Sequence, residues 1–235
     1  MKIMTFNTQH CHSYLGNSID IELMARVIKD SGADIVGLNE IYGKGDAFPF
    51  EDQTGRLAEL TSLENRYFAK AIDVHSWNSP YGNALISKYP IISAETIPVP
   101  DPDANCRIGN RSYETRCLLK AKLSCGLTVL IIHFGLNPEE KENAVKTVLE
   151  NIEDEKCILM GDFNITPDEA FLAPIKARMK DSAEIFEGER LSYPSDTPIK
   201  KIDYIFVSHD IELISADIPS IVASDHRPHT AEIRF

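Results

Sequence analysis

The sequence lacks several features that mark whole classes of protein. Among its 235 residues, no apolar run approaches the roughly 20 residues that a membrane-spanning helix needs. The five cysteines are odd in number and form no Cys-x-x-Cys pair, so neither a disulfide framework nor a thiolate zinc site is expected. Residues 1–7 read as a strand and leave no space for a signal peptide. Together with the cysteine usage, they favour a cytoplasmic, reduced protein.

Positive charge is also scarce. Lysine and arginine number 24 against 36 aspartates and glutamates, which gives a formal net charge of −12. A protein that binds nucleic-acid backbone over a large area usually carries the opposite sign, so a nucleic-acid substrate is possible but not favoured. The content of 43% hydrophobic and 26% charged residues is that of an ordinary globular protein.

No linker, low-complexity stretch or internal repeat interrupts the chain, so residues 1–235 are predicted to form a single domain. Periodicity predicts a helix capped by Ser18, a second around residues 57–63, a third at 138–153, and one at 167–179 that Pro174 breaks. Strands are predicted at 2–7, 34–40, 66–72, 82–87, 91–98, 112–123, 127–133, 157–160, 202–207, 211–216 and 228–235. Because several strands follow one another without intervening helices, a layered α/β architecture with mixed sheets is expected.

Polar side chains stand where several of these apolar segments end. They are Asn7, Asn39 with Glu40, His133, Asp162 with Asn164, and Asp225 with His226; Asp203 adds a carboxylate inside an apolar strand. Each alone has an ordinary explanation, such as a turn amide, a solvated acid or a core histidine. Strand ends, however, deliver side chains rigidly to one edge of a sheet. The joint occurrence of these residues therefore predicts a functional site at that edge.

In this order, the residues resemble the motifs of the endonuclease/exonuclease/phosphatase superfamily. That superfamily includes DNase I-like nucleases, apurinic endonucleases, inositol-polyphosphate 5-phosphatases, bacterial sphingomyelinases and deadenylases. The resemblance covers the whole chain, and its most specific parts are Gly-Asp-Phe-Asn at 161–164 and Ser-Asp-His at 224–226. It implies a DNase I-like α/β fold: a four-layer α/β/β/α sandwich, in which two mixed β-sheets pack face to face with helices outside.

The resemblance also implies a metal site and a base. A Mg²⁺ ion, for which Mn²⁺ is a possible substitute, would be bound by Glu40 with help from Asn7 and Asp225, since a hard cation prefers oxygen ligands. Asp162 would orient or deprotonate the attacking water. Asn164 would donate a hydrogen bond to a phosphoryl oxygen.

Four further residues complete the site that the resemblance implies. Asp203 would pair with His226, fix the orientation of the imidazole and favour its charged form. His133 would contact the phosphate. Arg116, in a Glu-x-Arg pattern, is a candidate phosphate or structural contact.

The expected activity is Mg²⁺-dependent hydrolysis of a phosphate ester, with a phosphodiesterase favoured. The alternatives are a DNA endonuclease or exonuclease of the apurinic type, and a non-catalytic phosphate-binding module. Inositol-phosphate specificity is not supported, because Met160 stands where the 5-phosphatases have tryptophan, and Ile202-Asp203-Tyr204 replaces their Cys-Asp-Arg. The sequence determines neither the natural substrate nor the oligomeric state.

Some features have no role in this hypothesis. The run His10-Cys11-His12 is interpreted as a loop with incidental donors, because three adjacent residues cannot all face one ion from a strand. Trp77 is either a half-buried aromatic or a residue that stacks on substrate. Substrate-selecting loops are expected at 42–54, 73–81, 99–111 and 184–199.

Overall fold

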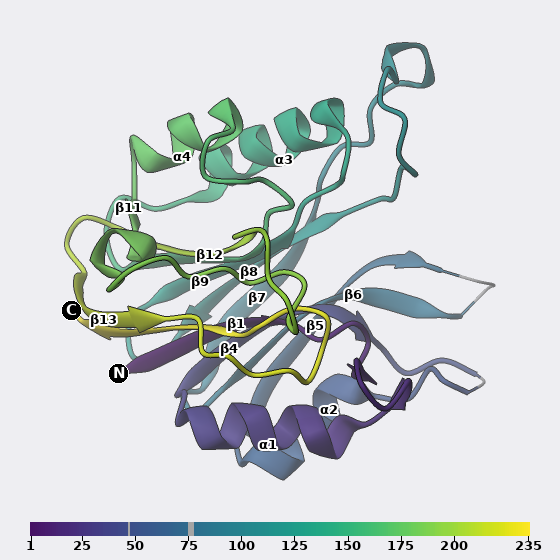
Figure 1. The fold of residues 1–235 in the computed structure, drawn as a ribbon, viewed down its shortest axis with the longest axis vertical. Helices are drawn as coiled ribbons and strands as arrows, with labels where there is room; N and C mark the ends of the chain where they lie inside the picture. Colours follow the sequence, from purple (N-terminus) through teal and green to yellow (C-terminus); the bar gives the residue numbers. More distant parts are fainter. Residues whose placement is uncertain (47, 75–77) are drawn as a thin grey trace.

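Two six-stranded mixed sheets lie face to face at the centre of the computed structural model, which describes residues 1–46, 48–74 and 78–235 (Figure 1). The first sheet has the order β13 (Glu212–Asp217), β14 (His229–Arg234), β1 (Lys2–Asn7), β4 (Ile35–Tyr42), β6 (Pro80–Ser87) and β5 (Asn65–Asp73). The second has the order β11 (Lys180–Asp181), β12 (Asp203–Val207), β10 (Cys157–Asp162), β9 (Thr128–His133), β8 (Cys117–Leu123) and β7 (Ile91–Pro98). Each sheet has one parallel pair at its centre, β1 with β4 and β9 with β10.

Helices cover the outer face of each sheet, as Figure 1 shows below and above the strands. α1 (Ile21–Ser31) and α2 (Gln53–Thr61) pack on the first sheet, whereas α3 (Pro138–Asn151) and the short α4 (Ala173–Lys176) pack on the second. The chain also forms a small ribbon, β2 (His12–Ser13) with β3 (Ser18–Ile19), and three 3₁₀ turns, η1 (Ala104–Cys106), η2 (Ala170–Leu172) and η3 (Ser182–Ile185). The predicted four-layer α/β/β/α sandwich is confirmed.

The alternation of side chains along the central strands explains where the polar residues lie. In β1, Ile3 belongs to the core between the sheets, whereas Met4 and Phe6 pack on the outer face against the helices. The inward row 3, 5, 7 therefore ends at Asn7, because successive strand side chains point to opposite faces. The rows 35-37-39, 129-131-133, 158-160-162 and 207-205-203 likewise run from the apolar inter-sheet core to a polar residue. The site is thus the polar end of the core between the sheets.

Several elements differ from their predicted bounds, and three of these differences have a clear physical cause. α1 is capped by Asp20, whose side chain accepts from the Leu23 backbone N–H at 2.8 Å, and not by Ser18. The strand predicted from residue 112 begins only at Cys117, because its first residues bind to polar groups near the start of α3. In the predicted helix 167–179, Pro174 lies in the first turn of α4, where a missing N–H costs nothing.

Among the described residues, no helix is long and apolar enough to cross a membrane.

Candidate active site

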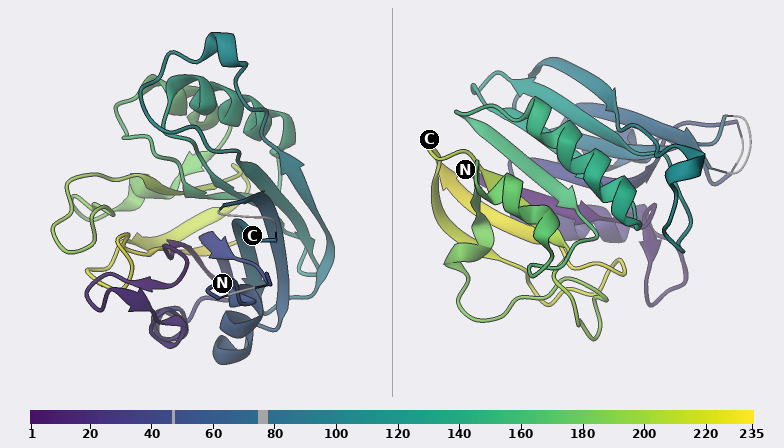
Figure 2. Two further views of the ribbon diagram at one scale, coloured as in Figure 1. Left: turned by 90° about the vertical axis from the view of Figure 1, so that its right-hand side faces the viewer. Right: turned by 90° about the horizontal axis from the view of Figure 1, so that it is seen from above.

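One pocket of about 550 Å³ collects the predicted residues at the edge of the sandwich where β1, β4, β9 and β10 end. Figure 2 (left) looks onto this edge. Seven of the nine predicted residues line it: Glu40, Arg116, His133, Asp162, Asn164, Asp225 and His226. The other two, Asn7 and Asp203, are fully buried behind it and hydrogen-bond to lining residues. Segments far apart in the sequence therefore meet in one place.

Asp162 is held at the centre by hydrogen bonds from both sheets. Its Oδ2 accepts from Asn7 Nδ2 at 3.0 Å and its Oδ1 accepts from the Asn164 backbone N–H at 2.9 Å. Its own backbone N–H donates to Asn39 Oδ1 at 2.9 Å. Burial raises the pKa of the Asp162 carboxyl, and the nearby His226 opposes that rise. A buried carboxyl with a raised pKa is suited to accept a proton from water.

Gly161 allows β10 to approach β9 at this point. A Cβ at this position would lie 1.8 Å from the carbonyl oxygen of Ile132, and the φ of Gly161 is 148°. No side chain fits there, so the residue before the central carboxylate has to be glycine.

Glu40 reaches the pocket through a bulge in β4. The register of β4 against β6 shifts between Leu38 and Ile41, and Glu40 has a φ of 58°. A left-handed conformation costs a non-glycine residue about 1–3 kcal/mol, and bulges of this kind redirect side chains next to active sites. The backbone N–H of His10 donates to the Glu40 carbonyl at 2.6 Å, which helps to hold the bulge.

Asn7 bridges two carboxylates through its amide nitrogen. Its Nδ2 donates to Glu40 Oε1 at 3.1 Å as well as to Asp162, while its Oδ1 accepts the backbone N–H of Gln9 at 3.1 Å. Because a backbone N–H can only donate, this contact fixes the amide orientation. This orientation lets Asn7 position the two acids, and its predicted role as a metal ligand stays a prediction.

His226 and Asp203 form the predicted pair. His226 Nδ1 lies 2.9 Å from Asp203 Oδ2, and both side chains are buried. Burial opposes the charged imidazole, but Asp203 and Asp162 outweigh it and raise the pKa of His226 to about 10. The ring is therefore a cation at neutral pH, with its Nε2 3.6 Å from Asp162 Oδ2.

His133, in contrast to His226, is neutral. Burial, the Arg116 guanidinium and charged His226 all lower its pKa well below the ordinary value. Arg116 Nη1 lies 3.1 Å from His133 Nδ1, and since a guanidinium can only donate, Nδ1 must accept. The proton is thus on Nε2, which lies 3.5 Å from Asp162 Oδ2. Arg116 also forms an ion pair with Glu114, and both side chains line the pocket.

Asn164 and Asp225 lie on either side of this centre. Asn164 Nδ2 donates to the Phe134 carbonyl at 3.1 Å and lies 3.3 Å from His133 Nε2, so two N–H donors point to the same part of the pocket. Asp225 Oδ1 accepts from Ser224 Oγ at 3.0 Å. The proximity of Asp225 contributes, after burial, to a raised pKa of Glu40. Two neighbouring carboxylates whose charges repel one another are suited to share a cation.

The donor set fits a divalent cation. Asp162, Asp203 and His226 form a buried cluster whose candidate ligand atoms all lie within 4.8 Å of one another. Because the charged His226 ring carries a proton on both nitrogens, only the carboxylates of this cluster can bind a cation. Asp203 Oδ1 is buried and has no hydrogen-bond partner among the described residues, so it can accept a further bond. The predicted ligands Glu40 and Asp225 line the same pocket. Carboxylate-rich donors of this kind suit Mg²⁺ or Mn²⁺.

Sequence reasoning missed several residues of the site. Tyr81, Arg111, Tyr193 and Lys200 also line the pocket, and all four lie in or next to the loops predicted to select substrate. Asn39 was noted only as the neighbour of Glu40. Its Nδ2 donates to the Ile132 carbonyl at 3.0 Å, so its amide links the two sheets behind Asp162. Its place in the inward row 35-37-39 is the signal that could have found it.

The run His10-Cys11-His12 forms a tight turn, as predicted for a loop. Gln9, His10 and Cys11 all have positive φ, and Cys11 is buried in the core beneath α1. The His10 ring stacks on Tyr42 with centroids 4.7 Å apart. Within the part of the chain that the structure describes, the run belongs to no cluster of three or more metal-binding side chains. Trp77 lies outside the described residues.

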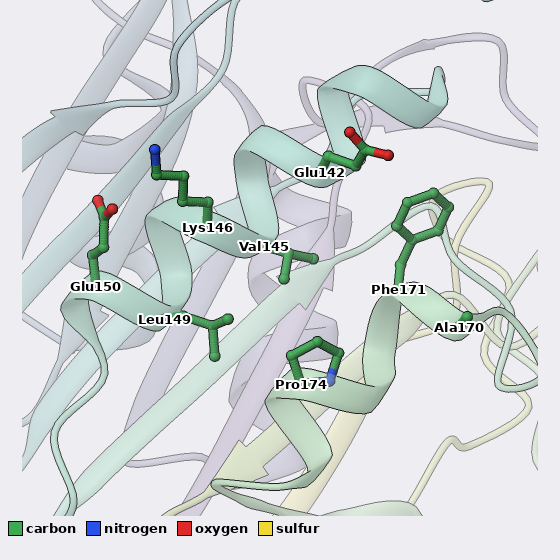
Figure 3. Close-up of a pocket in the computed structure, with 8 residues that line it drawn as sticks. All are labelled: Glu142, Val145, Lys146, Leu149, Glu150, Ala170, Phe171 and Pro174. Carbon is green, nitrogen blue, oxygen red and sulfur yellow. The ribbon is translucent and has the colours of Figure 1, made fainter.

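A second pocket, of about 500 Å³, lies between α3 and the η2–α4 segment (Figure 3). Its floor is Val145, Leu149, Phe171 and Pro174, with the charged groups of Glu142, Lys146 and Glu150 around it. It contains none of the predicted site residues.

Solved structures of other proteins share this fold. An endonuclease/exonuclease/phosphatase from Beutenbergia cavernae has a TM-score of 0.79 at 20% identity, over 100% of this chain and 71% of its own. A mannosyl-6-phosphatase from Bacteroides thetaiotaomicron has a TM-score of 0.79 at 14% identity, and a Neisseria 3′ phosphatase bound to a product DNA hairpin has 0.67 at 18%, each over 100% of both chains. At these identities the likeness is one of fold.

A search of curated proteins found no match. A sequence profile of the Endonuclease/Exonuclease/phosphatase family, by contrast, matches residues 4–226, from β1 to His226. With the profile, the four-layer sandwich and the buried Asp/His cluster in agreement, the chain belongs to the endonuclease/exonuclease/phosphatase family.

Proposed function

We propose that the protein is a Mg²⁺-dependent phosphodiesterase, within the phosphate-ester hydrolases of its family. The observation that carries this proposal is Asp162: a buried carboxyl with a raised pKa, flanked by one cationic and one neutral histidine. A base and two hydrogen-bond donors of this kind are what the attack of water on a phosphoryl group requires.

Each residue has a role that follows from its contacts. Asp162 orients the attacking water and takes up its proton. The His226 imidazolium, held by Asp203, donates from Nε2 to the negative charge that develops on the phosphoryl oxygens. His133 Nε2 and Asn164 Nδ2 are neutral donors to the same group. Asn7 and Asn39 hold Asp162 in place.

A divalent cation would be held by Glu40 and Asp225, with Asp162 adjacent. When bound, it supplies charge neutralisation at the phosphoryl and leaving oxygens. Three carboxylates in one pocket would otherwise repel both one another and an anionic substrate.

Two alternatives have specific support. The names of the Bacteroides and Neisseria structures both identify phosphatases, which favours a monoester substrate. The Neisseria protein was bound to a DNA hairpin, which supports a nuclease activity as the second alternative. The net charge of −12 disfavours binding to a long duplex.

The test is hydrolysis of bis-p-nitrophenyl phosphate and p-nitrophenyl phosphate, each with Mg²⁺, Mn²⁺ or EDTA. We expect metal-dependent release that is faster from the diester, and a loss of at least about 100-fold in His226→Ala. His209→Ala, at an exposed histidine away from the pocket, is the matched control and should be unaffected. A faster reaction of the monoester would replace the phosphodiesterase with a phosphatase. Full activity in His226→Ala would disprove the mechanism.

A further inference from the structure

Two cations at the rim of the catalytic pocket have no acidic partner. Four lysines and arginines line this pocket: Arg111, Arg116, Lys141 and Lys200. Arg116 is paired with Glu114, and Lys141 Nζ lies 2.9 Å from Glu169. Arg111 and Lys200 are exposed, and their side chains form no ion pair or hydrogen bond with any residue that the structure describes.

The position of these two unpaired cations beside the pocket distinguishes them. Carboxylates outnumber lysine and arginine by 36 to 24, and some surface arginines have acidic partners, such as Arg178 with Asp154 and Arg190 with Asp217, but exposed cations such as Arg66 that lack a described partner do not line the pocket. Cations left unpaired beside a ligand pocket in an acidic protein are available to an anion.

The backbone that carries Arg111 is held in place by two residues at the start of α3, Asn137 and Glu139. Glu139 Oε1 accepts the backbone N–H of Ile108 at 2.5 Å and that of Gly109 at 3.1 Å. Asn137 Oδ1 accepts the N–H of Arg111 at 3.0 Å, and its Nδ2 donates to the Arg111 carbonyl at 3.2 Å. These bonds tie the segment that follows η1 to the N-terminal end of α3, beside which Figure 2 shows it.

The other cation is also on an anchored backbone. Lys200 exchanges two hydrogen bonds with Tyr193, each 3.0 Å long, and its carbonyl accepts the N–H of Ser192 at 2.8 Å. Both cations therefore project from fixed Cα positions, which lowers the entropy lost when they bind a ligand.

Charge is separated along the pocket. The acids without a lysine or arginine partner, Glu40, Asp162 and Asp225, are at the catalytic end with His226, while the unpaired Arg111 and Lys200 are exposed at the rim. A volume of about 550 Å³ is that of a small-molecule site. A ligand that spans the pocket would place one anion at the catalytic end and a second at the rim.

We propose that Arg111 and Lys200 form a second anion-binding site, and that the natural substrate is a small phosphate ester with a second anionic group, a phosphate or a carboxylate. This inference rests on the proposed function, because the first anion is the ester phosphate. A free bisphosphate and two neighbouring phosphates of a short nucleic-acid strand offer the same chemistry.

The test measures binding separately from hydrolysis. Alkane bisphosphonates with two to six carbons, which cannot be hydrolysed, are compared by calorimetry with the monophosphonates of equal length. We expect one chain length at which the second phosphonate improves affinity at least about tenfold, as a charge-assisted contact does. This gain should be lost in Arg111→Ala and in Lys200→Ala. It should be kept in Arg66→Ala, the control, which removes an exposed arginine near the start of β5, whereas the pocket-lining Tyr81 pairs with Ile72 near the end of that strand.

Each outcome is decisive. Equal affinity for both members of every pair in the wild type, or a gain that survives in both rim variants, would overturn the second site. Tetrathymidylate provides the nucleic-acid arm of the test. If it binds more tightly than the best bisphosphonate, and if this difference in affinity disappears in Arg111→Ala and Lys200→Ala, the second anion is a phosphate of a nucleic-acid strand. A preference for the bisphosphonate without hydrolysis of either nitrophenyl ester would support the second anion site and reject the proposed enzymatic function. Hydrolysis without a preference for the bisphosphonate would support the proposed function and reject the second anion site.

Discussion

The two histidines of the pocket, His226 and His133, lie at similar distances from one oxygen of Asp162, yet one is a cation and the other is neutral. His226 Nε2 and His133 Nε2 lie 3.6 and 3.5 Å from Asp162 Oδ2, and both rings are buried. Burial lowers the pKa of each. The difference lies at Nδ1, which meets a carboxylate in His226 and a guanidinium in His133. The partner on the far nitrogen, and not the degree of burial, decides which histidine is the cation.

The largest effect should come from removing the oxygen that both histidines approach. Asp162→Asn replaces the base with an amide, so we expect a decrease in kcat of about 10²–10⁴-fold, the usual contribution of a general base. The measurement is kcat on the nitrophenyl esters, with circular dichroism to show that the fold is intact. A decrease of less than tenfold would mean that Asp162 is not the base.

The next comparison removes one histidine at a time. We expect His226→Ala to lose at least about 100-fold in kcat and His133→Ala about tenfold, because charged donors form stronger hydrogen bonds to phosphoryl oxygens than neutral ones. Parallel assays of the two variants at pH 7 provide the measurement. Equal losses would show that the charge difference has no catalytic consequence.

Asp203→Asn should bring the pKa of His226 closer to that of His133. The wild-type imidazolium persists up to the His226 pKa of about 10, so activity should fall only as pH rises through that value. Without the Asp203 charge the pKa falls, and the alkaline limb of the pH–rate profile should move to lower pH. The folding contribution of this proton has the same sign: it is complete below the ordinary value of 6.5 and is lost as pH rises through about 10. An unmoved alkaline limb would contradict this account.

The smallest effect concerns Arg116. Arg116→Met removes the donor to His133 Nδ1, so we expect the pKa of His133 to rise while staying below its usual value, since burial is the larger cause. NMR of the imidazole ¹⁵N and ¹³Cε1 resonances reports both the pKa and the tautomer. Activity should fall by about tenfold or less. A His133 ring that keeps its pKa and its Nε2–H tautomer would remove Arg116 from the account.

Much of this arrangement could be predicted from the sequence, because an apolar run that ends in a polar residue is a local signal. Such runs placed Asn7, His133 and Asp162 at strand ends, and the resemblance to the family motifs linked them to Asp203 and His226. The bulge at Glu40 could not be predicted, since it depends on how β4 pairs with β6. The charge states of the histidines also depend on contacts between residues far apart in the chain.

The segment before β8 shows the same limit. Residues 112–116 read as the start of a strand, and the polar groups that hold residues 108–114 come from residues 137–140, about 26 positions later in the sequence. Neither Arg111 nor Lys200 carries a motif. Their relevance appears only when the pocket and its ion pairs are known.

The hold that α3 exerts on this segment has a consequence for how such an enzyme could change during evolution. Apart from the Tyr113 hydroxyl, which donates to Glu139 at 2.8 Å, the bonds from Asn137, Glu139 and Glu140 go to backbone atoms of residues 108–114. The conformation of the segment is therefore nearly independent of the side chains that it presents. With the proposed role of Arg111, substitutions at this position would alter what the rim binds without unfolding the segment or disturbing Asp162, so single mutations there would make new substrates accessible.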